Sequence, residues 1–237
     1  MKNITHNEWP EAIILCGGKG ERLRPVTNEI PKPLVIINDE PILHYVIEHL
    51  NRFNIDKIHI ASGYKSNVIK KYFSDNIFEA DIKIYDSGNV DIIKRLQDIL
   101  EEVQNDVLVL YGDTISNVNI QELIMHHRSS SKQITMTVWP LKSPYGLVEI
   151  DENETVESFA EKPTLDKWIN IGYFYVNNNY RQMIFDNDSF ENFLLKSAEN
   201  KFINAYKHYG FHITVNTLSE LEDAQKNIKK IIGSEAQ

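Results

Sequence analysis

A glycine-rich loop near the start of the chain holds the residues best suited to bind phosphate. The loop consists of Gly17, Gly18, Lys19, Gly20, Glu21 and Arg22, directly after Cys16. Glycine lets backbone N–H groups approach a ligand closely, and nearby cations add positive charge. The pattern favours a site for a triphosphate and the edge of a base.

Three prolines determine how this loop continues. Pro25, Pro31 and Pro33 exclude a regular helix, so Arg22 and Lys32 are expected on a long, stiffened segment above the end of a sheet. The spacing matches neither the dinucleotide motif G-x-G-x-x-G nor the P-loop. Solvent-exposed charge is the simpler alternative for Arg22 and Lys32.

The first half of the chain alternates apolar, strand-like runs with segments of helical period, which predicts a parallel sheet. The expected elements there are strands 11–16, 57–62, 82–85 and 107–111 and helices 41–53, 66–73 and 92–103. The second half has a mixed or antiparallel pattern, with strands 134–139, 147–150, 156–161 and 169–176, a helix 190–200, one or two strands within 205–215, and a helix 220–232. The predicted fold class is α/β, a Rossmann-like, mixed but mainly parallel central sheet flanked by helices. One domain spans 1–237, with 1–10 as an N-terminal extension.

Composition excludes several classes of protein. With 25 Lys and Arg against 34 Asp and Glu, the net charge of −9 argues against a nucleic-acid partner. No apolar run is long enough to span a membrane and the N-terminus lacks a signal peptide, so a soluble, cytoplasmic protein without a membrane partner is expected. The single cysteine excludes an internal disulfide.

Gly112 and Asp113 follow the apolar strand 107–111. A carboxylate at the carboxyl edge of a parallel sheet lies where ligands of such sheets bind, and it could hold Mg²⁺ on a triphosphate. An aspartate that caps a turn is the simpler alternative.

These pieces together resemble the sugar-1-phosphate nucleotidyltransferases, and most closely their glucose-1-phosphate cytidylyltransferase branch. The resemblance covers nearly the whole chain, in order, through segments 15–25, 31–34, 63–65, 68–73, 111–114, 145–146, 161–163, 170–172, 210–211 and 216–217. It implies the nucleotide-diphospho-sugar transferase fold and an enzyme that uses Mg²⁺.

The resemblance also implies a reaction. An oxygen of a sugar or polyol phosphate attacks the α-phosphorus of a nucleoside triphosphate, with CTP favoured, and pyrophosphate leaves. Arg22 would hold the leaving phosphates, Lys32 would contact the phosphates nearer the reacting centre, and Asp113 would bind the metal. Such a step needs positioning and charge neutralisation more than a covalent intermediate. The product would be a precursor of surface polysaccharide.

Further residues acquire roles only through the resemblance. Lys162 would pair with the acceptor phosphate and Glu161 would hold sugar hydroxyls, although an exposed Glu-Lys pair is the simpler reading. The remaining acceptor contacts would be Tyr145, Gly146, Asn170 and Gly172, and the nucleotide contacts would include Ser87, Gly88 and Gly112.

Two departures from the family pattern leave alternatives open. Asn216 stands where relatives carry a second metal carboxylate, and an amide offers an oxygen without the charge; a helix cap is the other reading of Asn216. The stretch 85–91, where relatives have a longer glycine-rich segment, is short. A nucleotide-binding regulatory homologue with weak turnover and a cytidylyltransferase acting on a non-sugar phosphate such as phosphocholine therefore remain alternatives. A homo-oligomer is compatible with the resemblance, and the sequence leaves the oligomeric state open.

Overall fold

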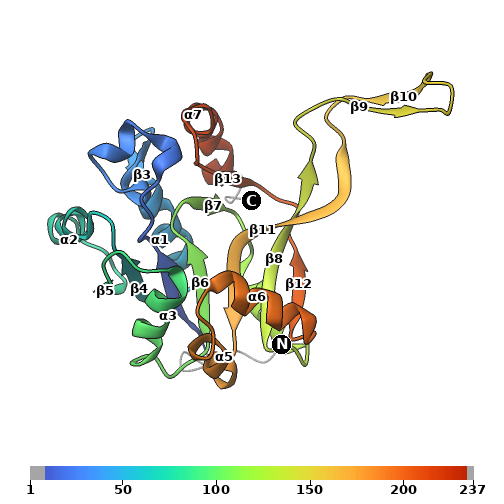
Figure 1. Cartoon of the computed structure of the whole chain (residues 1–237). Coiled ribbons are helices and arrows are strands. Elements are labelled where there is room, and N and C mark those ends of the chain that lie inside the picture. Colours follow the sequence, from blue (N-terminus) through green and yellow to red (C-terminus); the bar gives the residue numbers. More distant parts are fainter. Residues whose placement is uncertain (1–8, 234–237) are drawn as a thin grey trace.

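The computed structural model describes residues 9–233, and side chains of residues 9–229. A seven-stranded sheet with the order β12-β8-β11-β6-β1-β4-β5 runs through it (Figure 1). The strands are β1 (Glu11–Leu15), β4 (Lys57–Ser62), β5 (Asp81–Asp86), β6 (Val107–Tyr111), β8 (Ile134–Lys142), β11 (Thr164–Val176) and β12 (Ile203–Lys207). Only β11 is antiparallel to its neighbours in this sheet. The predicted α/β class with a mixed, mainly parallel sheet is confirmed.

Helices cover both faces of the sheet, because each has an apolar stripe and the strands alternate between the two faces. One core cluster joins the sheet to α1 (Ile42–Arg52), α2 (Ser66–Asp75) and α4 (Ile120–Arg128). The other joins it to α3 (Ile92–Leu100), α5 (Arg181–Phe185) and α6 (Phe190–Glu199). Within β1, Ile14 belongs to the first cluster and Ile13 to the second. The sheet is therefore buried on both faces, which leaves the ends of its strands for ligand binding.

The segment after the glycine loop contains short 3-10 turns in place of a helix. They are Glu21–Leu23, Val26–Asn28 and Lys32–Leu34, followed by the small hairpin of β2 (Ile36–Ile37) and β3 (Glu40–Pro41). This agrees with the proline pattern. A third core cluster packs this segment against the C-terminal helix α7 (Leu218–Gly233) and against the antiparallel pair β7 (Thr114–Ser116) and β13 (His212–Thr214).

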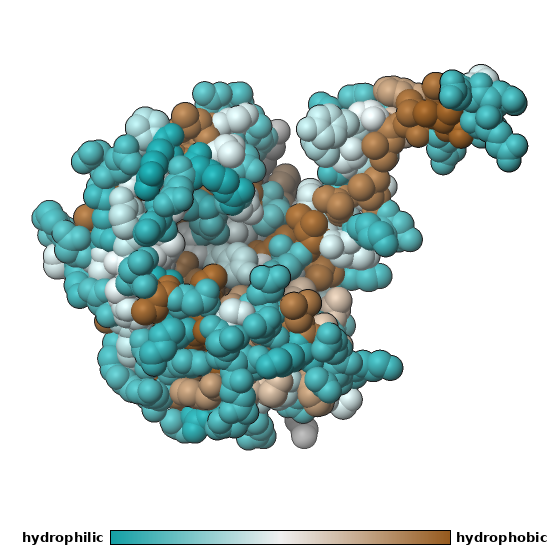
Figure 2. Space-filling model, in the orientation of Figure 1, coloured by the Kyte–Doolittle hydropathy of each residue, from teal (hydrophilic) through white to brown (hydrophobic). Residues whose placement is uncertain are grey.

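A hairpin projects away from the body of the molecule (Figure 1). It consists of β9 (Leu147–Ile150) and β10 (Val156–Ala160), and residues 143–163 are called the arm below. Pairing places Val148 opposite Phe159 and Ile150 opposite Val156, so one face of the arm is apolar and exposed. Apolar surface gathers on the arm and at its root in Figure 2.

Several predicted boundaries were wrong. The helix expected over 92–103 ends at Leu100; Val103 still packs into the core from the following turn, so the apolar pattern outlasts the helix. The strands expected over 134–139 and 169–176 extend to Lys142 and back to Thr164, because both continue into the arm. The segment 205–215 divides into β12 and β13, and β7 and α5 had not been expected. Most of the expected extension 1–10 lies outside the described residues. Within residues 9–233, none of the helices has the length and apolar character needed to cross a membrane.

Candidate active site

Two adjoining cavities lie at the carboxyl ends of β1 and β6. After β1 the chain continues to β4, and after β6 it continues toward β8, and these strands lie on opposite sides of the β6-β1 pair in the sheet. Open α/β sheets bind ligands at such a switch point. The first cavity, of about 510 Å³, is lined by Leu15, Cys16, Gly17, Gly18, Gly20, Glu21, Arg22, Lys32, Pro33, Ile92, Arg95, Tyr111, Asp113 and Asn216. The second, of about 570 Å³, is lined by Arg22, Tyr111, Asp113, Thr114, Ile169, Asn170, Ile171, His212, Thr214, Asn216 and Glu220. Arg22, Tyr111, Asp113 and Asn216 line both cavities.

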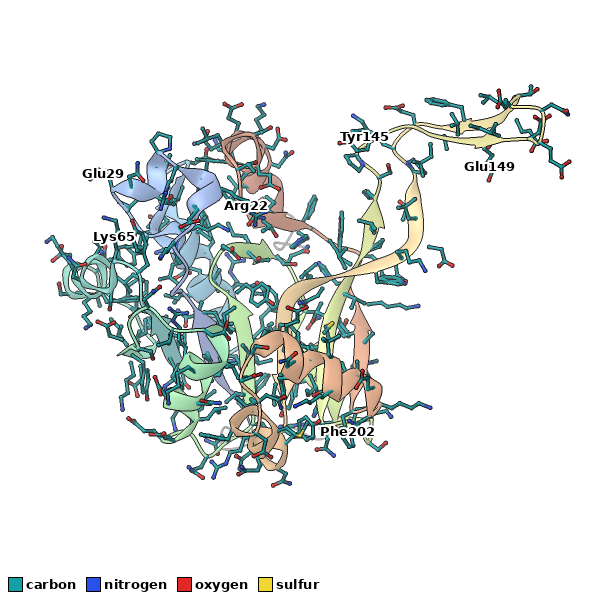
Figure 3. The ribbon with its side chains drawn as sticks, in the orientation of Figure 1. Arg22, Glu29, Lys65, Tyr145, Glu149 and Phe202 are labelled. Atoms are coloured by element: carbon teal, nitrogen blue, oxygen red, sulfur yellow. The ribbon has the colours of Figure 1, made fainter. Side chains whose placement is uncertain are left out.

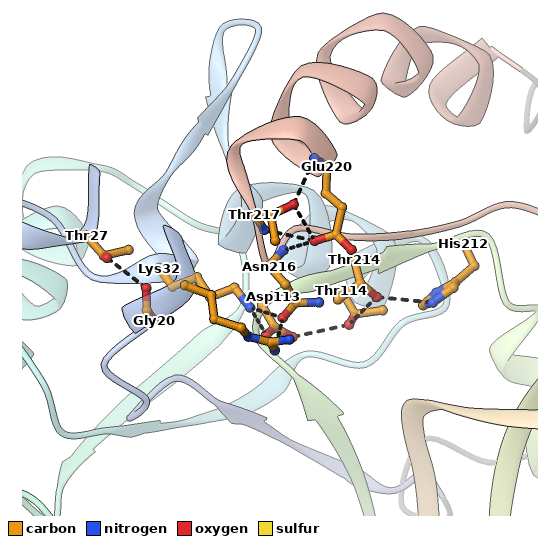
Figure 4. Close-up of polar contacts among 11 residues, drawn as sticks. Gly20, Thr27, Lys32, Asp113, Thr114, His212, Thr214, Asn216, Thr217 and Glu220 are labelled. Carbon is orange, nitrogen blue, oxygen red and sulfur yellow. Dashed lines mark hydrogen bonds and ion pairs between the residues drawn. The ribbon is translucent and has the colours of Figure 1, made fainter. Parts of the chain in front are cut away.

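Lys32 contacts two of the residues that line both cavities, Asp113 and Asn216. Its side chain is 11% exposed, and its Nζ forms an ion pair with the Asp113 carboxylate. The same Nζ donates to Asn216 Oδ1 at 2.8 Å, and Arg22 Nη2 donates to that oxygen at 2.9 Å. Two cations, one carboxylate and one amide therefore converge where the cavities meet (Figure 4). The arrangement suits a polyanion, because phosphate oxygens can take the same N–H donors.

Asn216 reaches this point because of how α7 begins. The backbone N–H of Val215 donates to the Asp113 carbonyl at 3.3 Å, which ties the two strand ends together. Glu220 then accepts from the backbone N–H groups of Asn216 and Thr217 at 2.7 and 2.8 Å, while the Glu220 N–H donates to Thr217 Oγ1 at 3.2 Å (Figure 4). This is a capping box on Thr217. Thr217 is therefore the capping residue, and the side chain of Asn216 is left to point at Lys32.

Asp113 and Asn216 are the side chains placed to bind a divalent cation. Both offer oxygen, the ligand that Mg²⁺ prefers, and both already lie within reach of one ammonium group. Thr114 Oγ1 donates to the other Asp113 oxygen at 3.2 Å. Among the residues that the structure describes, no three His, Cys, Asp or Glu side chains form a metal-binding group. A cation here would thus need ligands from a bound phosphate as well.

Cys16 lines the first cavity as a buried, free cysteine. It is buried, and burial together with the charge of Asp113 raises the pKa of its thiol. A side chain at Gly112 would place its Cβ 2.7 Å from Cys16 Sγ, so glycine is needed where β1 and β6 run side by side. Cys16 is thus a small, closely packed group in the cavity lining, whereas Gly112 packs behind it and lines neither cavity.

Tyr111 separates the cavities, and two residues predicted as acceptor contacts hold it. Gly172 has φ of +78°, and a Cβ there would lie 2.4 Å from the Tyr111 ring, so the ring packs directly on this glycine. Asn170 donates to the Tyr111 hydroxyl at 3.4 Å and accepts from the Gly172 N–H at 2.8 Å. Burial raises the pKa of Tyr111, which keeps its hydroxyl protonated. Gly172 therefore acts through Tyr111, whereas Asn170 itself lines the second cavity.

The second cavity is lined by polar groups without a formal charge on its β13 side. His212 Nε2 and Thr214 Oγ1 lie 3.1 Å apart, and Thr214 lies 3.5 Å from Thr114 Oγ1. Burial lowers the pKa of His212 to about 4, with a further contribution from His208 and an opposing one from Asp113. The imidazole is therefore neutral at pH 7, and this wall can hydrogen-bond hydroxyl groups.

The other predicted acceptor residues lie in the arm. Tyr145 is at its root (Figure 3), Gly146 is the next residue, and Glu161 and Lys162 directly follow β10. Neither described cavity has these residues in its lining. A Cβ on Gly146 would meet the Phe159 ring at 2.6 Å, so this glycine serves packing within the arm.

Some of the remaining predicted nucleotide contacts line the first cavity and others do not. Gly18, Gly20 and Glu21 line it, while Lys19 is exposed on the loop. Gly88 does not line it; its carbonyl accepts from Arg95, which does. Ser87 precedes Gly88 in the same turn.

Sequence reasoning missed several lining residues. They include Leu15, Pro33, Ile92, Arg95, Tyr111, Thr114, Ile169, Ile171, His212, Thr214 and Glu220. Arg95 had a usable signal, since it is a cation within the apolar stripe of a helix. Glu220 also had one, as the third residue after Thr217 in a capping-box pattern. His212 and Thr214 had none, because their role depends on β13 pairing with β7.

Comparison with known proteins identifies the family. The profile of the family described as nucleotidyl transferase matches residues 11–230. The chain is 29% identical to a probable glucose-1-phosphate cytidylyltransferase of Bacillus subtilis (strain 168), covering 91% of this chain and 95% of that protein. It is 30% identical to the D-glycero-alpha-D-manno-heptose 1-phosphate guanylyltransferase of Aneurinibacillus thermoaerophilus, covering 94% of this chain and 100% of the relative.

A solved structure has the same fold. A putative glucose-1-phosphate thymidylyltransferase from Bacillus anthracis superposes with a TM-score of 0.74 at 18% identity, covering 94% of this chain and 96% of that one. At this identity the likeness concerns the sheet order and its helical layers. Relatives whose names specify cytidine, guanosine and thymidine nucleotides thus share one architecture.

Proposed function

The chain belongs to the nucleotidyl transferase family, and on that premise we propose that this sugar-phosphate nucleotidyltransferase moves CMP from CTP to a sugar or polyol phosphate and releases pyrophosphate. The product would be an activated precursor of surface polysaccharide. Because the reaction consumes nucleoside triphosphate, the proposal also places it in the cytoplasm.

The observation that carries the proposal is the junction of the two cavities at Lys32. A triphosphate in the first cavity would have its phosphates against Arg22 and Lys32, and an acceptor phosphate would approach from the second cavity. The attacking oxygen and the leaving pyrophosphate then lie on opposite sides of the α-phosphorus, as in-line displacement requires. Lys32 is nearly buried, so its charge is less screened than that of a surface lysine.

We also propose that Asp113 and Asn216 hold Mg²⁺ when the triphosphate is bound. The donor set fits, because Mg²⁺ commonly takes one or two protein oxygens and completes its shell with phosphate oxygens and water. The ion would neutralise charge on the phosphates. Lys32 and Arg22 would then transfer hydrogen bonds from Asn216 to the nucleotide.

The acceptor end has two groups of candidate contacts. Asn170, His212 and Thr214 line the second cavity and suit sugar hydroxyls. Tyr145, Gly146, Glu161 and Lys162 are proposed to complete this end from the arm, with Lys162 on the acceptor phosphate.

Guanylyl transfer is the second candidate. It is favoured by the guanylyltransferase relative, which is matched over 100% of its length. In that case the acceptor would be a sugar 1-phosphate, as the relative's name specifies.

Pyrophosphate release tests these proposals. The assay would pair CTP, GTP, UTP, dTTP and ATP with sugar phosphates, polyol phosphates and phosphocholine, each with and without Mg²⁺. We expect CTP with a sugar or polyol phosphate to give the fastest release. Fastest release with GTP would select the second candidate, and fastest release with phosphocholine would select a non-sugar acceptor. No release from any pair would refute transferase activity and favour the nucleotide-binding regulatory homologue.

A further inference from the structure

Arg95 is a buried cation on the apolar side of α3. Its exposed fraction is 5%, and its helical neighbours on that side are Ile93, Leu96 and Ile99. Burial of a guanidinium group costs free energy unless its N–H donors are hydrogen-bonded. Burial lowers the pKa of Arg95, against an opposing effect of Asp91. Such a residue needs a compensating interaction, or a ligand that supplies one.

The hydrogen bonds that Arg95 makes use only some of its N–H donors. Nη2 donates to the carbonyl oxygens of Gly88 at 2.8 Å and Gly17 at 3.2 Å. Nε is buried and, among the described residues, has no hydrogen-bond partner. The guanidinium nevertheless lines the first cavity. An unsatisfied buried donor at the floor of a ligand cavity indicates that a ligand acceptor completes it.

Two glycines make room for this side chain. A Cβ on Gly17 would lie 2.1 Å from Arg95 Nε, and a Cβ on Gly63 would lie 2.6 Å from Nη2. Gly17 follows β1, Gly63 follows β4 and Gly88 follows β5. The guanidinium therefore sits where the loops after three consecutive strands of the sheet converge.

That position lies on the side of β1 away from the reacting centre. Asp113 follows β6, and the sheet order β6-β1-β4-β5 places β6 on one side of β1 and β4 and β5 on the other. A triphosphate held at Lys32 and Asp113 must extend its nucleoside along the cavity, toward the end where Arg95 lies. Arg95 is therefore at the base end of the nucleotide.

We propose that Arg95 reads the nucleobase by donating a hydrogen bond to its carbonyl oxygen. Guanidinium is a donor only, and because Nη2 already serves the carbonyl oxygens of Gly17 and Gly88, Nη1 and Nε are left for a ligand acceptor. Cytosine offers O2 and guanine offers O6 as that acceptor. Adenine has no carbonyl and places an amino donor next to its ring nitrogens. This inference rests on the proposed nucleotidyl transfer, and it makes Arg95 a specificity residue that favours carbonyl-bearing bases over adenine.

The test is calorimetric binding without an acceptor, using CTP, GTP, UTP, ATP and inorganic tripolyphosphate, each with Mg²⁺. Arg95→Met keeps the length of the side chain and removes its donors. We expect it to weaken binding of the preferred triphosphate by about 10- to 100-fold, since a hydrogen bond to a charged group contributes that much. ATP and tripolyphosphate should change less than about threefold. The preference over ATP should therefore collapse.

Lys94→Met is the matched control. Lys94 is the preceding residue of α3, on the exposed side, where it pairs with Asp98 at 2.8 Å. This variant should bind all ligands as the unmodified chain does. If Arg95→Met does not fold by circular dichroism, Arg95→Lys replaces it, with the same loss of preference expected because a single ammonium nitrogen does not reproduce the separate positions of Nη1 and Nη2.

Other outcomes overturn the inference. An equal loss for tripolyphosphate and the preferred nucleotide would make Arg95 a phosphate or scaffold residue. If Arg95→Met leaves the ratio of the affinity for the preferred triphosphate to the affinity for ATP unchanged, Arg95 does not read the base. A preference of the unmodified chain for ATP would also exclude base reading. Because no acceptor is present, a chain that binds CTP but releases no pyrophosphate would refute the proposed function and leave this inference standing.

Discussion

The glycine loop after β1 is held on several sides, whereas the arm is exposed to solvent on both faces. Gly17 packs on Arg95, Gly20 accepts from Thr27 Oγ1 at 2.8 Å, and Lys32 is fixed by Asp113 and Asn216. On the arm, Phe159 is 65% exposed and the apolar face formed with Val148 is uncovered in the single chain.

The two regions differ as the two substrate ends of the proposed site would. The triphosphate group is common to every nucleotidyl transfer, so a rigid, preorganised pocket would lower the barrier at that end. The acceptor differs from one relative to another, as their names indicate. A two-stranded arm outside the sheet, proposed above to hold the acceptor, can change without disturbing the core.

The sharpest test of the rigid half is Lys32→Met. Removing this buried charge should lower kcat by about 100- to 1000-fold, as loss of a preorganised donor does elsewhere. Steady-state pyrophosphate release measures the effect. Lys71→Met is the control, because Lys71 pairs with Asp75 on exposed α2 and should leave kcat unchanged. Equal kcat for both variants would mean that Lys32 serves folding alone.

Gly172→Ala tests whether the division between the cavities depends on close packing. The positive φ and the 2.4 Å approach to Tyr111 predict a loss of about 2 to 4 kcal/mol in the free energy of unfolding. Gly18→Ala is the matched control, since a Cβ there meets nothing within 4 Å. Denaturant titration of both variants checks this. Similar midpoints would contradict a packing role for Gly172.

Lys162→Met tests the exposed half. If the arm contacts the acceptor phosphate, the KM for the acceptor should rise about tenfold, as expected for one lost charge-assisted hydrogen bond, while the KM for the nucleotide stays the same. Lys167→Met, in the exposed start of β11, provides a control outside the arm. A parallel rise of both KM values would show that the halves are not separable.

Asn216→Asp should produce the smallest effect. A second carboxylate beside Asp113 should lower the half-saturating Mg²⁺ concentration by about threefold or more, because carboxylate charge sets divalent-ion affinity. A Mg²⁺ titration of the reaction rate measures it. An unaltered titration curve would count against Asn216 as a neighbour of the metal.

The parts of the site that could be predicted were those with local signals. Gly17 to Arg22 and Asp113 stand directly after apolar strands, and the position of a strand end follows from pattern alone. The roles of Tyr111 and Arg95 could not be predicted in this way. Tyr111 looks like the last residue of a strand and Arg95 like an interruption of an apolar stripe, and each acquires its place from glycines in other segments, Gly172 of β11 for Tyr111 and two loop glycines for Arg95.

From the sequence alone came the alternation of strands and helices, the glycine loop and the prolines that keep Lys32 out of a helix, because these depend on backbone preferences over a few residues. The tertiary structure decided the meeting of Lys32 with Asn216, 184 positions later, the placing of Arg95 under three loops, and the separation of the arm from both cavities. The physical reason is that these contacts depend on the packing of α7 against β2 and β13 and of α3 against β4 and β5. Such packing reflects the whole chain and has no signature within any one segment.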